Sequence, residues 1–147
     1  MAWANRDSWA QRLSTLTQQR LAFFKQFLAD LVAGPYDAVA VDARIDGLIS
    51  NNPVCVFSFT SCPFCKKALD KLDALGAKDV AVLQLDKEDD GPAVRSRLGQ
   101  RTNRTSVPAI WIGGDYVGGR NDGAPGLLPL DDAGLLVPKL HAAGALL

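Results

Sequence analysis

Apolar side chains recur at helical spacing through the first part of the chain. Between Ser8 and Val32 they follow one another at intervals of three and four residues, with one wider gap that contains Arg20. This spacing predicts an amphipathic helix with a broad apolar stripe, which ends at Gly34-Pro35. The stripe comprises Trp9, Leu13, Leu16, Phe24, Phe27 and Leu31, with Leu21, Phe23 and Leu28 beside it.

From residue 38 onward, helical and strand patterns alternate. A run of β-branched and aromatic residues before Cys62 is typical of a buried strand, and the spacing after it is helical. Gly99 is the expected stop of a later helix, and Gly113-Gly114-Asp115 indicates a hairpin. The predicted elements are helix 38–49, strand 54–59, helix 63–75, strand 80–85, helix 92–98, strands 109–112 and 116–117, and two short helices near 124–133 and 135–143.

This order predicts an α/β fold with a four-stranded mixed sheet flanked by helices. We expect residues 38–147 to form that domain and residues 1–37 to be a helical extension. The simplest expectation for the extension is that it packs on the domain with its apolar stripe hidden. The alternative is a helix that binds a partner or a second copy of the chain.

Composition and charge narrow the choice of function. The 147 residues suit one ordinary domain, and 16 basic side chains balance 16 acidic ones, so the charge favours neither nucleic acid nor an anionic membrane. No apolar stretch is long enough to span a membrane, and Arg6 and Asp7 interrupt any secretory signal. We expect a cytoplasmic protein. The alternative is a mitochondrial or plastid protein, since Arg12 and Arg20 add positive charge, but Asp30 counts against it.

The cysteines carry the strongest chemical signal. There are three, Cys55, Cys62 and Cys65, which is too few for a disulfide-stapled secreted domain and favours a reducing compartment. A cysteine at the start of a helix meets unpaired N–H groups and the positive end of the helix dipole, which favour its thiolate. The second cysteine, three residues later, can close a disulfide with it. A structural zinc site is the alternative, but it would have to recruit Cys55 and the lone His141.

Two further segments complete the pattern. Val107-Pro108 stands at the start of a strand, where a cis bond would present the backbone of Val107 to a substrate. A proline at this position can also simply mark the start of a strand, with no functional role. Gly118-Gly119 with the polar residues behind it can approach and hold a charged group, and can also be an ordinary turn.

Cys55 and Trp111 are expected in the core, and His141 on a helix surface.

These motifs together resemble a dithiol glutaredoxin of the thioredoxin-like superfamily, over about residues 38 to 145. The resemblance rests on Val56-Phe57-Ser58, Cys62-Pro63-Phe64-Cys65-Lys66-Lys67, Gly99-Gln100-Arg101-Thr102, Val107-Pro108, and Gly118-Gly119 with Asp122. It implies a thioredoxin-like fold and a glutathione-dependent reduction of disulfides, above all of mixed disulfides between glutathione and proteins. Glutathione would be the co-substrate, and no metal is expected.

The resemblance also implies roles for individual residues. Cys62 would be the nucleophile and Cys65 the resolving thiol. Val107, before the family's cis-proline at Pro108, would pair its backbone with the cysteinyl part of glutathione. Further glutathione-binding residues expected on this basis are Thr60 and Phe64 near the dithiol, and Gly119, Arg120, Asn121 and Asp122 around the γ-glutamyl end, with Asp122 the partner of its ammonium group.

The sequence departs from the family pattern in two places. Phe59 stands where the family usually has a lysine, three residues before the nucleophile, and the segment between Gly99 and Val107 is longer than usual. Arg101 or Arg104 in that segment is expected to supply the missing cation. Some glutaredoxins carry an iron–sulfur cluster instead of acting as enzymes, and Pro63 argues against that alternative. The expected partners are glutathionylated or disulfide-containing proteins, with no nucleic acid and no membrane, and the chain is expected to be a monomer or a weak dimer through its N-terminal helix.

Overall fold

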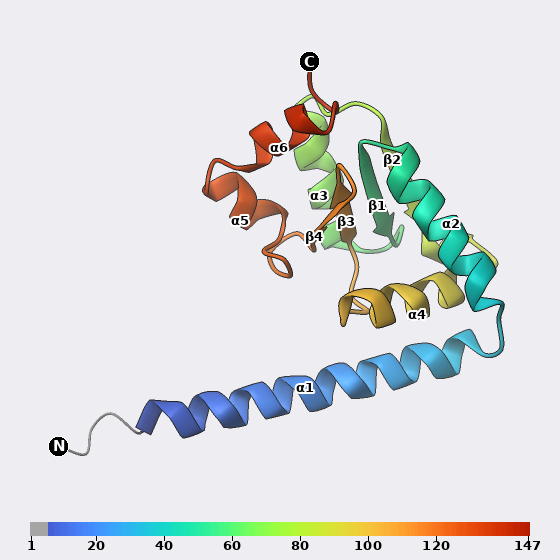
Figure 1. Cartoon of the computed structure of the whole chain (residues 1–147), viewed down its shortest axis with the longest axis vertical. Helices are drawn as coiled ribbons and strands as arrows, with labels where there is room; N and C mark the ends of the chain where they lie inside the picture. Colours follow the sequence, from blue (N-terminus) through green and yellow to red (C-terminus); the bar gives the residue numbers. More distant parts are fainter. Residues whose placement is uncertain (1–5) are drawn as a thin grey trace.

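A four-stranded mixed sheet organises the chain from residue 54 onward (Figure 1). The computed structural model describes residues 6–147, with side chains from residue 13. The central strand β1 (Val54–Ser58) pairs in parallel with β2 (Val80–Gln84) and antiparallel with β3 (Ala109–Ile112). Strand β4 (Asp115–Gly118) completes the hairpin and the order β2-β1-β3-β4. The predicted α/β fold, with its mixed sheet and helical flanks, is confirmed.

The helices cover both faces of the sheet. They are α2 (Ala38–Asn51), α3 (Pro63–Ala74), α4 (Gly91–Thr102), α5 (Leu127–Asp132) and α6 (Leu136–Ala142), and a short 3-10 turn, η1 (Leu85–Lys87), follows β2. Because side chains alternate along a strand, Val56 faces one hydrophobic core with α3, α5 and α6, whereas Phe57 faces a second core with α2 and α4. Cys55 and Trp111 are buried in the second core and His141 is exposed on α6, as expected. The short helix expected near 124–133 begins later, at Leu127.

Helix α4 corrects the predicted helix end at Gly99. The helix continues to Thr102, and Asn103 is its left-handed C-terminal residue, with φ of 57°. Residues 99–102 therefore add about one turn to the helix, and residues 103–106 form the loop before Val107. Gly99 serves a different purpose, because an added Cβ would lie 2.0 Å from Oε1 of Gln26 and 2.6 Å from Cγ2 of Thr105. The glycine lets an N-terminal helix approach closely.

That N-terminal helix, α1 (Arg6–Ala33), lies beneath α4, and its N-terminal half extends beyond the end of α4 (Figure 1). Small and polar residues make the contact. Ala29 is buried, Gln26 donates from Nε2 to the Ser96 carbonyl at 3.2 Å, and the buried Ser96 hydroxyl donates to Asp30. The Ser96 hydroxyl also hydrogen-bonds the Tyr36 hydroxyl at 2.9 Å. The predicted helix is confirmed, although Trp9, Arg6, Asp7 and Arg12 lie outside the residues whose side chains are described.

The expectation that the apolar stripe of α1 is hidden is wrong. The large apolar side chains of α1 remain exposed, and we call the face that they form the outer face of α1. At its edges, Leu21, Leu28 and Val32 also border cavities between α1 and the domain. The least exposed of them, Leu28, is 42% exposed and the most exposed, Phe23, is 76% exposed. Helix α1 has an apolar face and a face of small and polar residues. Because the two helices approach closely at Gly99, the face of small and polar residues is the one that packs against α4. The outer face consists of Leu13, Leu16, Leu21, Phe23, Phe24, Phe27, Leu28, Leu31 and Val32. Over the described part of the chain, no helix combines the length and the apolar character needed to cross a membrane.

Candidate active site

Cys62 lies at the junction between β1 and α3, at the position that caps the helix. Its Sγ accepts the backbone N–H of Cys65 at 3.2 Å, and Pro63 takes the first helical turn, where no N–H is needed. A sulfur in this position faces the positive end of the helix dipole, which stabilises negative charge. Cys62 is half-buried, so the thiol reaches solvent while its backbone is held by the helix.

The two other thiols are in different environments. Cys65 is 1% exposed, and burial, followed by its hydrogen bond with Cys62, raises the pKa of the Cys65 thiol to about 11. Cys55 is equally buried, and burial raises the pKa of its thiol to about 12. The chain therefore presents one accessible thiol with a buried, protonated thiol beside it.

Asp86 holds the loop that precedes the dithiol. This residue belongs to η1, which follows β2, and its carboxylate accepts the backbone N–H of Thr60 at 3.0 Å and also the Thr60 hydroxyl. These hydrogen bonds, with the one from the hydroxyl first, lower the pKa of Asp86. The parallel pairing of β1 and β2 places both C-terminal ends at the same edge of the sheet, which brings Asp86 to the loop. No local sequence signal marks this contact, because Asp86 lies 26 residues from Thr60 in the chain.

The loop before β3 forms the second wall of the site. The Val107–Pro108 bond is cis, and the Cys62 thiol donates to the carbonyl of Val107 with sulfur and oxygen 3.9 Å apart. The cis Val107–Pro108 segment therefore lies beside the Cys62 sulfur. Phe64, in the first turn of α3, is 50% exposed at the same end of the molecule.

The segment after β4 folds back onto the loop before β3. Gly118 has φ of 105°, and a Cβ there would lie 2.7 Å from backbone atoms of Asp122 and Ala124, so a side chain is excluded. The Gly119 N–H donates to the Asp122 carbonyl at 2.8 Å. Arg104 donates from Nη2 to the Asp122 carboxylate at 2.7 Å and to the Ser106 hydroxyl at 3.3 Å. This bridge joins the Asp122 segment to the loop that carries Val107.

Arg101 and Arg104 point to different parts of the molecule. Arg101 pairs with Asp46 at 2.6 Å and with Asp42 at 3.5 Å, which ties α4 to α2. Arg104, by contrast, lies at the Asp122 segment. The structure therefore separates the two candidate cations and brings only Arg104 to the predicted residues.

A second cation, which sequence reasoning missed, covers Phe59. The guanidinium of Arg95 lies 5.2 Å from the centre of the Phe59 ring, a cation–π distance, and donates from Nε to the carbonyl of Thr105 at 2.9 Å. A cavity of about 470 Å³ opens here between α1, α4 and the Phe59 loop. Lys25 of α1 lines both this cavity and a smaller one beside Asp122. No local sequence signal marks Arg95 or Lys25, because each reaches the site from a distant helix.

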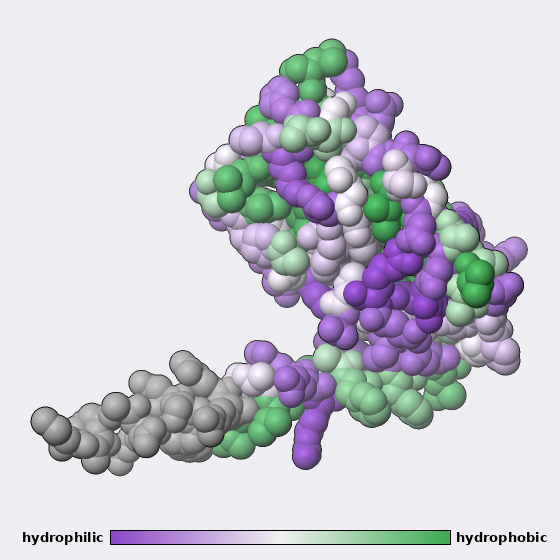
Figure 2. Space-filling model, in the orientation of Figure 1, coloured by the Kyte–Doolittle hydropathy of each residue, from purple (hydrophilic) through white to green (hydrophobic). Residues whose placement is uncertain are grey.

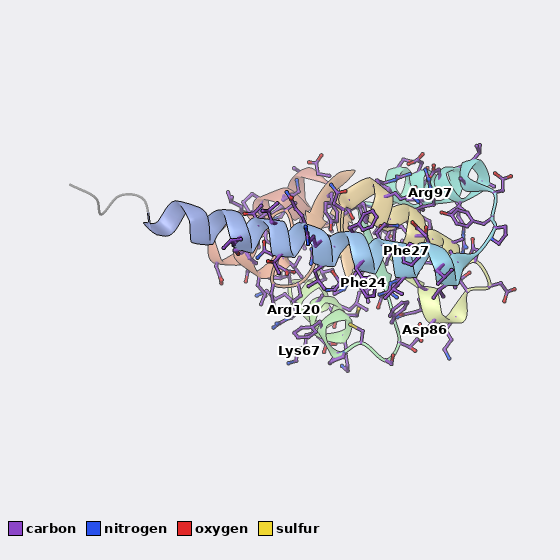
Figure 3. The ribbon with its side chains drawn as sticks, turned by 90° about the horizontal axis from the view of Figure 1, so that it is seen from below. Phe24, Phe27, Lys67, Asp86, Arg97 and Arg120 are labelled. Atoms are coloured by element: carbon purple, nitrogen blue, oxygen red, sulfur yellow. The ribbon has the colours of Figure 1, made fainter. Side chains whose placement is uncertain are left out.

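Side chains near the dithiol and side chains of the α4–α2 contact lie on opposite sides of α1. Seen from below α1, Lys67, Asp86 and Arg120 emerge on one side of the helix, and Arg97 of the α4–α2 contact emerges on the other (Figure 3). Arg120 donates from Nη1 to the Asn121 side chain at 2.9 Å. Among the residues that the structure describes, no group of three or more His, Cys, Asp or Glu side chains is arranged to hold a metal ion.

Comparison with known proteins places these features in a family. The family model described as glutaredoxin matches residues 54–117. A glutaredoxin from Ricinus communis is 41% identical over 98 residues, which cover 67% of this chain and 91% of the relative. Glutaredoxin-C2 from Arabidopsis thaliana is 39% identical over 99 residues, covering 67% and 85% of the two chains. The buckwheat glutaredoxin–glutathione complex superposes with a TM-score of 0.72 at 32% identity, covering 77% of this chain and 100% of that one.

Proposed function

This chain belongs to the glutaredoxin family of thiol oxidoreductases, and from that premise we propose that it uses glutathione to reduce mixed disulfides between glutathione and proteins, and disulfides within proteins. The observation that carries the proposal is the environment of Cys62. Its sulfur caps α3, contacts the Val107 carbonyl and lies beside a buried thiol. A solved relative of similar fold is a complex with glutathione, which supports the choice of co-substrate.

The proposed reaction proceeds by thiolate exchange. The Cys62 thiolate attacks the glutathione sulfur of a mixed disulfide, the old S–S bond breaks, and the protein leaves as a thiolate that takes up a proton. A second glutathione thiolate then attacks the glutathione sulfur bound to Cys62. This step forms glutathione disulfide and returns Cys62 as a thiolate.

Cys65 serves substrates that carry an internal disulfide. The Cys62 thiolate joins one substrate sulfur and the substrate S–S bond breaks, so the other sulfur leaves as a thiolate that takes up a proton. The Cys65 thiol then loses its proton and attacks Cys62 Sγ, which breaks the bond from Cys62 to the substrate, releases that sulfur as a thiol and leaves a Cys62–Cys65 disulfide. Two glutathione molecules reduce that disulfide. The raised pKa of Cys65 keeps it protonated at neutral pH, so that Cys62 is the thiol that attacks first.

The polar groups around Cys62 suggest how glutathione is oriented. We assign the γ-glutamyl end to the Gly119–Asp122 segment, where Arg104 holds Asp122 and leaves its carboxylate 77% exposed for the ammonium group. The cysteinyl backbone would pair with Val107. For the glycine carboxylate we assign Arg95 and Lys25, which border the cavity at Phe59 and replace the lysine that Phe59 displaces.

A glutathione-coupled disulfide reductase assay on three proteins tests the proposal. The wild type is expected to reduce a glutathionylated peptide and a protein disulfide, and Cys62→Ser to reduce neither. Cys65→Ser is expected to retain the first activity and lose the second. A Cys65→Ser protein inactive on the glutathionylated peptide would contradict the one-cysteine route, and an active Cys62→Ser protein would contradict the assignment of the nucleophile.

A further inference from the structure

The outer face of α1 is a large apolar surface that nothing in the domain covers. In the space-filling view, hydrophobic residues follow the side of α1 that faces away from the rest of the protein (Figure 2). Phe24 and Phe27 lie on the side of α1 turned to the viewer in Figure 3, with the domain behind the helix. Their exposures are 55% and 53%. A soluble helix normally buries such residues, so the surface requires an occupant.

The area of the outer face is that of a protein–protein interface. Its nine side chains are exposed by 42% to 76%. At about 200 Å² for a side chain of this size, they expose on the order of 1,000 Å². The largest apolar patch on a monomer is about 300–600 Å², and a standard interface buries about 800 Å² on each partner.

The charges on this helix favour a second copy of the chain over a membrane or a charged partner. Arg20 is the one charged residue within the arc of the outer face, and its long side chain can extend past the edge of a contact. A helix that lies on a membrane needs a charged face opposite its apolar face, but the opposite side of α1 carries Ala29 and Gln26 and is covered by α4.

The shape of α1 supports the same occupant. The helix has 28 residues, and half of it extends beyond α4, where a lone helix in water is marginal. We propose that two copies of this protein associate through the outer faces of their α1 helices, related by a two-fold axis. Such a symmetric contact pairs each apolar surface with an identical one, so it needs no complementary charge. Leu28 and Val32 also line the cavity at Phe59, so the second copy would border that cavity.

Sedimentation velocity and light scattering on the full chain, from about 1 to 100 µM, test this proposal. The wild type is expected to reach twice its chain mass of 15.7 kDa. The double variant Phe24→Glu, Phe27→Glu is expected to stay monomeric at the same concentrations. Val39→Glu is the matched control, because Val39 is an apolar residue of α2 that is 80% exposed and lies outside the outer face. It should dimerise like the wild type.

Far-UV circular dichroism, together with the resistance of the buried Cys55 and Cys65 thiols to alkylation, establishes that each variant is folded before its mass is measured. A wild type that remains monomeric throughout overturns the proposal. So does a double variant that still dimerises, because the contact then lies elsewhere. Monomeric wild-type protein that cosediments with phosphatidylcholine vesicles would assign the outer face to lipid instead.

Discussion

Replacing Gly99 with alanine tests the contact between α4 and α1. In a helix interior this change normally stabilises a protein by about 0.5–1 kcal/mol, because glycine loses more backbone entropy on folding. Here the new Cβ would lie 2.0 Å from Gln26 Oε1 and 2.6 Å from Thr105 Cγ2, well inside van der Waals contact. The two effects have opposite signs. The sign of the net change in the free energy of unfolding therefore shows whether α1 packs against α4 at Gly99.

The size of the penalty follows from what each neighbour can do. The Gln26 side chain is flexible and can swing away, but it then gives up its hydrogen bonds to the Ser96 carbonyl and to Asp30, at about 1 kcal/mol each. The methyl group of Thr105 is buried on a β-branched side chain that cannot turn easily, and such overpacking costs about 1–3 kcal/mol. After the helix-propensity gain is subtracted, we expect Gly99→Ala to destabilise the protein by about 2–4 kcal/mol.

Urea unfolding followed by circular dichroism measures this difference. Gly47→Ala is the matched control, because Gly47 lies inside α2 with no atom within 4 Å of an added Cβ, and it should gain about 0.5–1 kcal/mol. In a Gln26→Ala background, the penalty of Gly99→Ala should shrink, since one of the two colliding groups is gone. If Gly99→Ala instead stabilised the protein as much as Gly47→Ala, α1 would not lie against this turn of α4.

Three further predictions concern the site. Arg95→Gln and Lys25→Ala should each raise KM for a glutathionylated peptide about two- to fivefold with kcat unchanged, because a partly exposed ion pair with the substrate contributes only modestly to binding. Equal losses in kcat would refute a binding role. Asp86→Ala should lower kcat/KM about tenfold by freeing the loop before the dithiol, and unchanged steady-state kinetics would contradict that role. Iodoacetamide at pH 7 should modify Cys62 alone, as read by peptide mass spectrometry. In Cys62→Ser, modification of Cys65 should rise only as the pH approaches its raised pKa of about 11, and rapid labelling at pH 7 would refute its burial.

The parts of the fold that sequence reasoning predicted are those set by neighbouring residues. Strand β1 is a continuous apolar run, and the dithiol follows it at the start of a helix, so both could be placed from local pattern alone. The end of α4 could not. Gly99 resembled a helix stop because glycine is common at helix C-termini, yet Asn103 is the residue that takes the left-handed conformation. Gly99 instead allows α1, a helix distant in the chain, to pack closely against α4.

The same limit applies to α1 and to the cations at Phe59. Helical spacing shows that α1 has an apolar side and a polar side, but the choice between them depends on the surface of α4. Arg95 and Lys25 approach Phe59 only after α1 and α4 have docked. Sequence reasoning sought the missing cation in the segment close to Val107, and one of its two candidates, Arg101, is instead held by α2.

The way α1 is attached makes it a transplantable unit. The contact between the two helices consists of Gln26 and Asp30 on α1 and of Ser96 and Gly99 on α4. No strand of the sheet takes part in these contacts. Grafting the helix onto a related domain would therefore require few changes on the solvent side of one helix and none in the interior. A protein engineer could use it to add an association surface to a redox domain without redesigning its catalytic end.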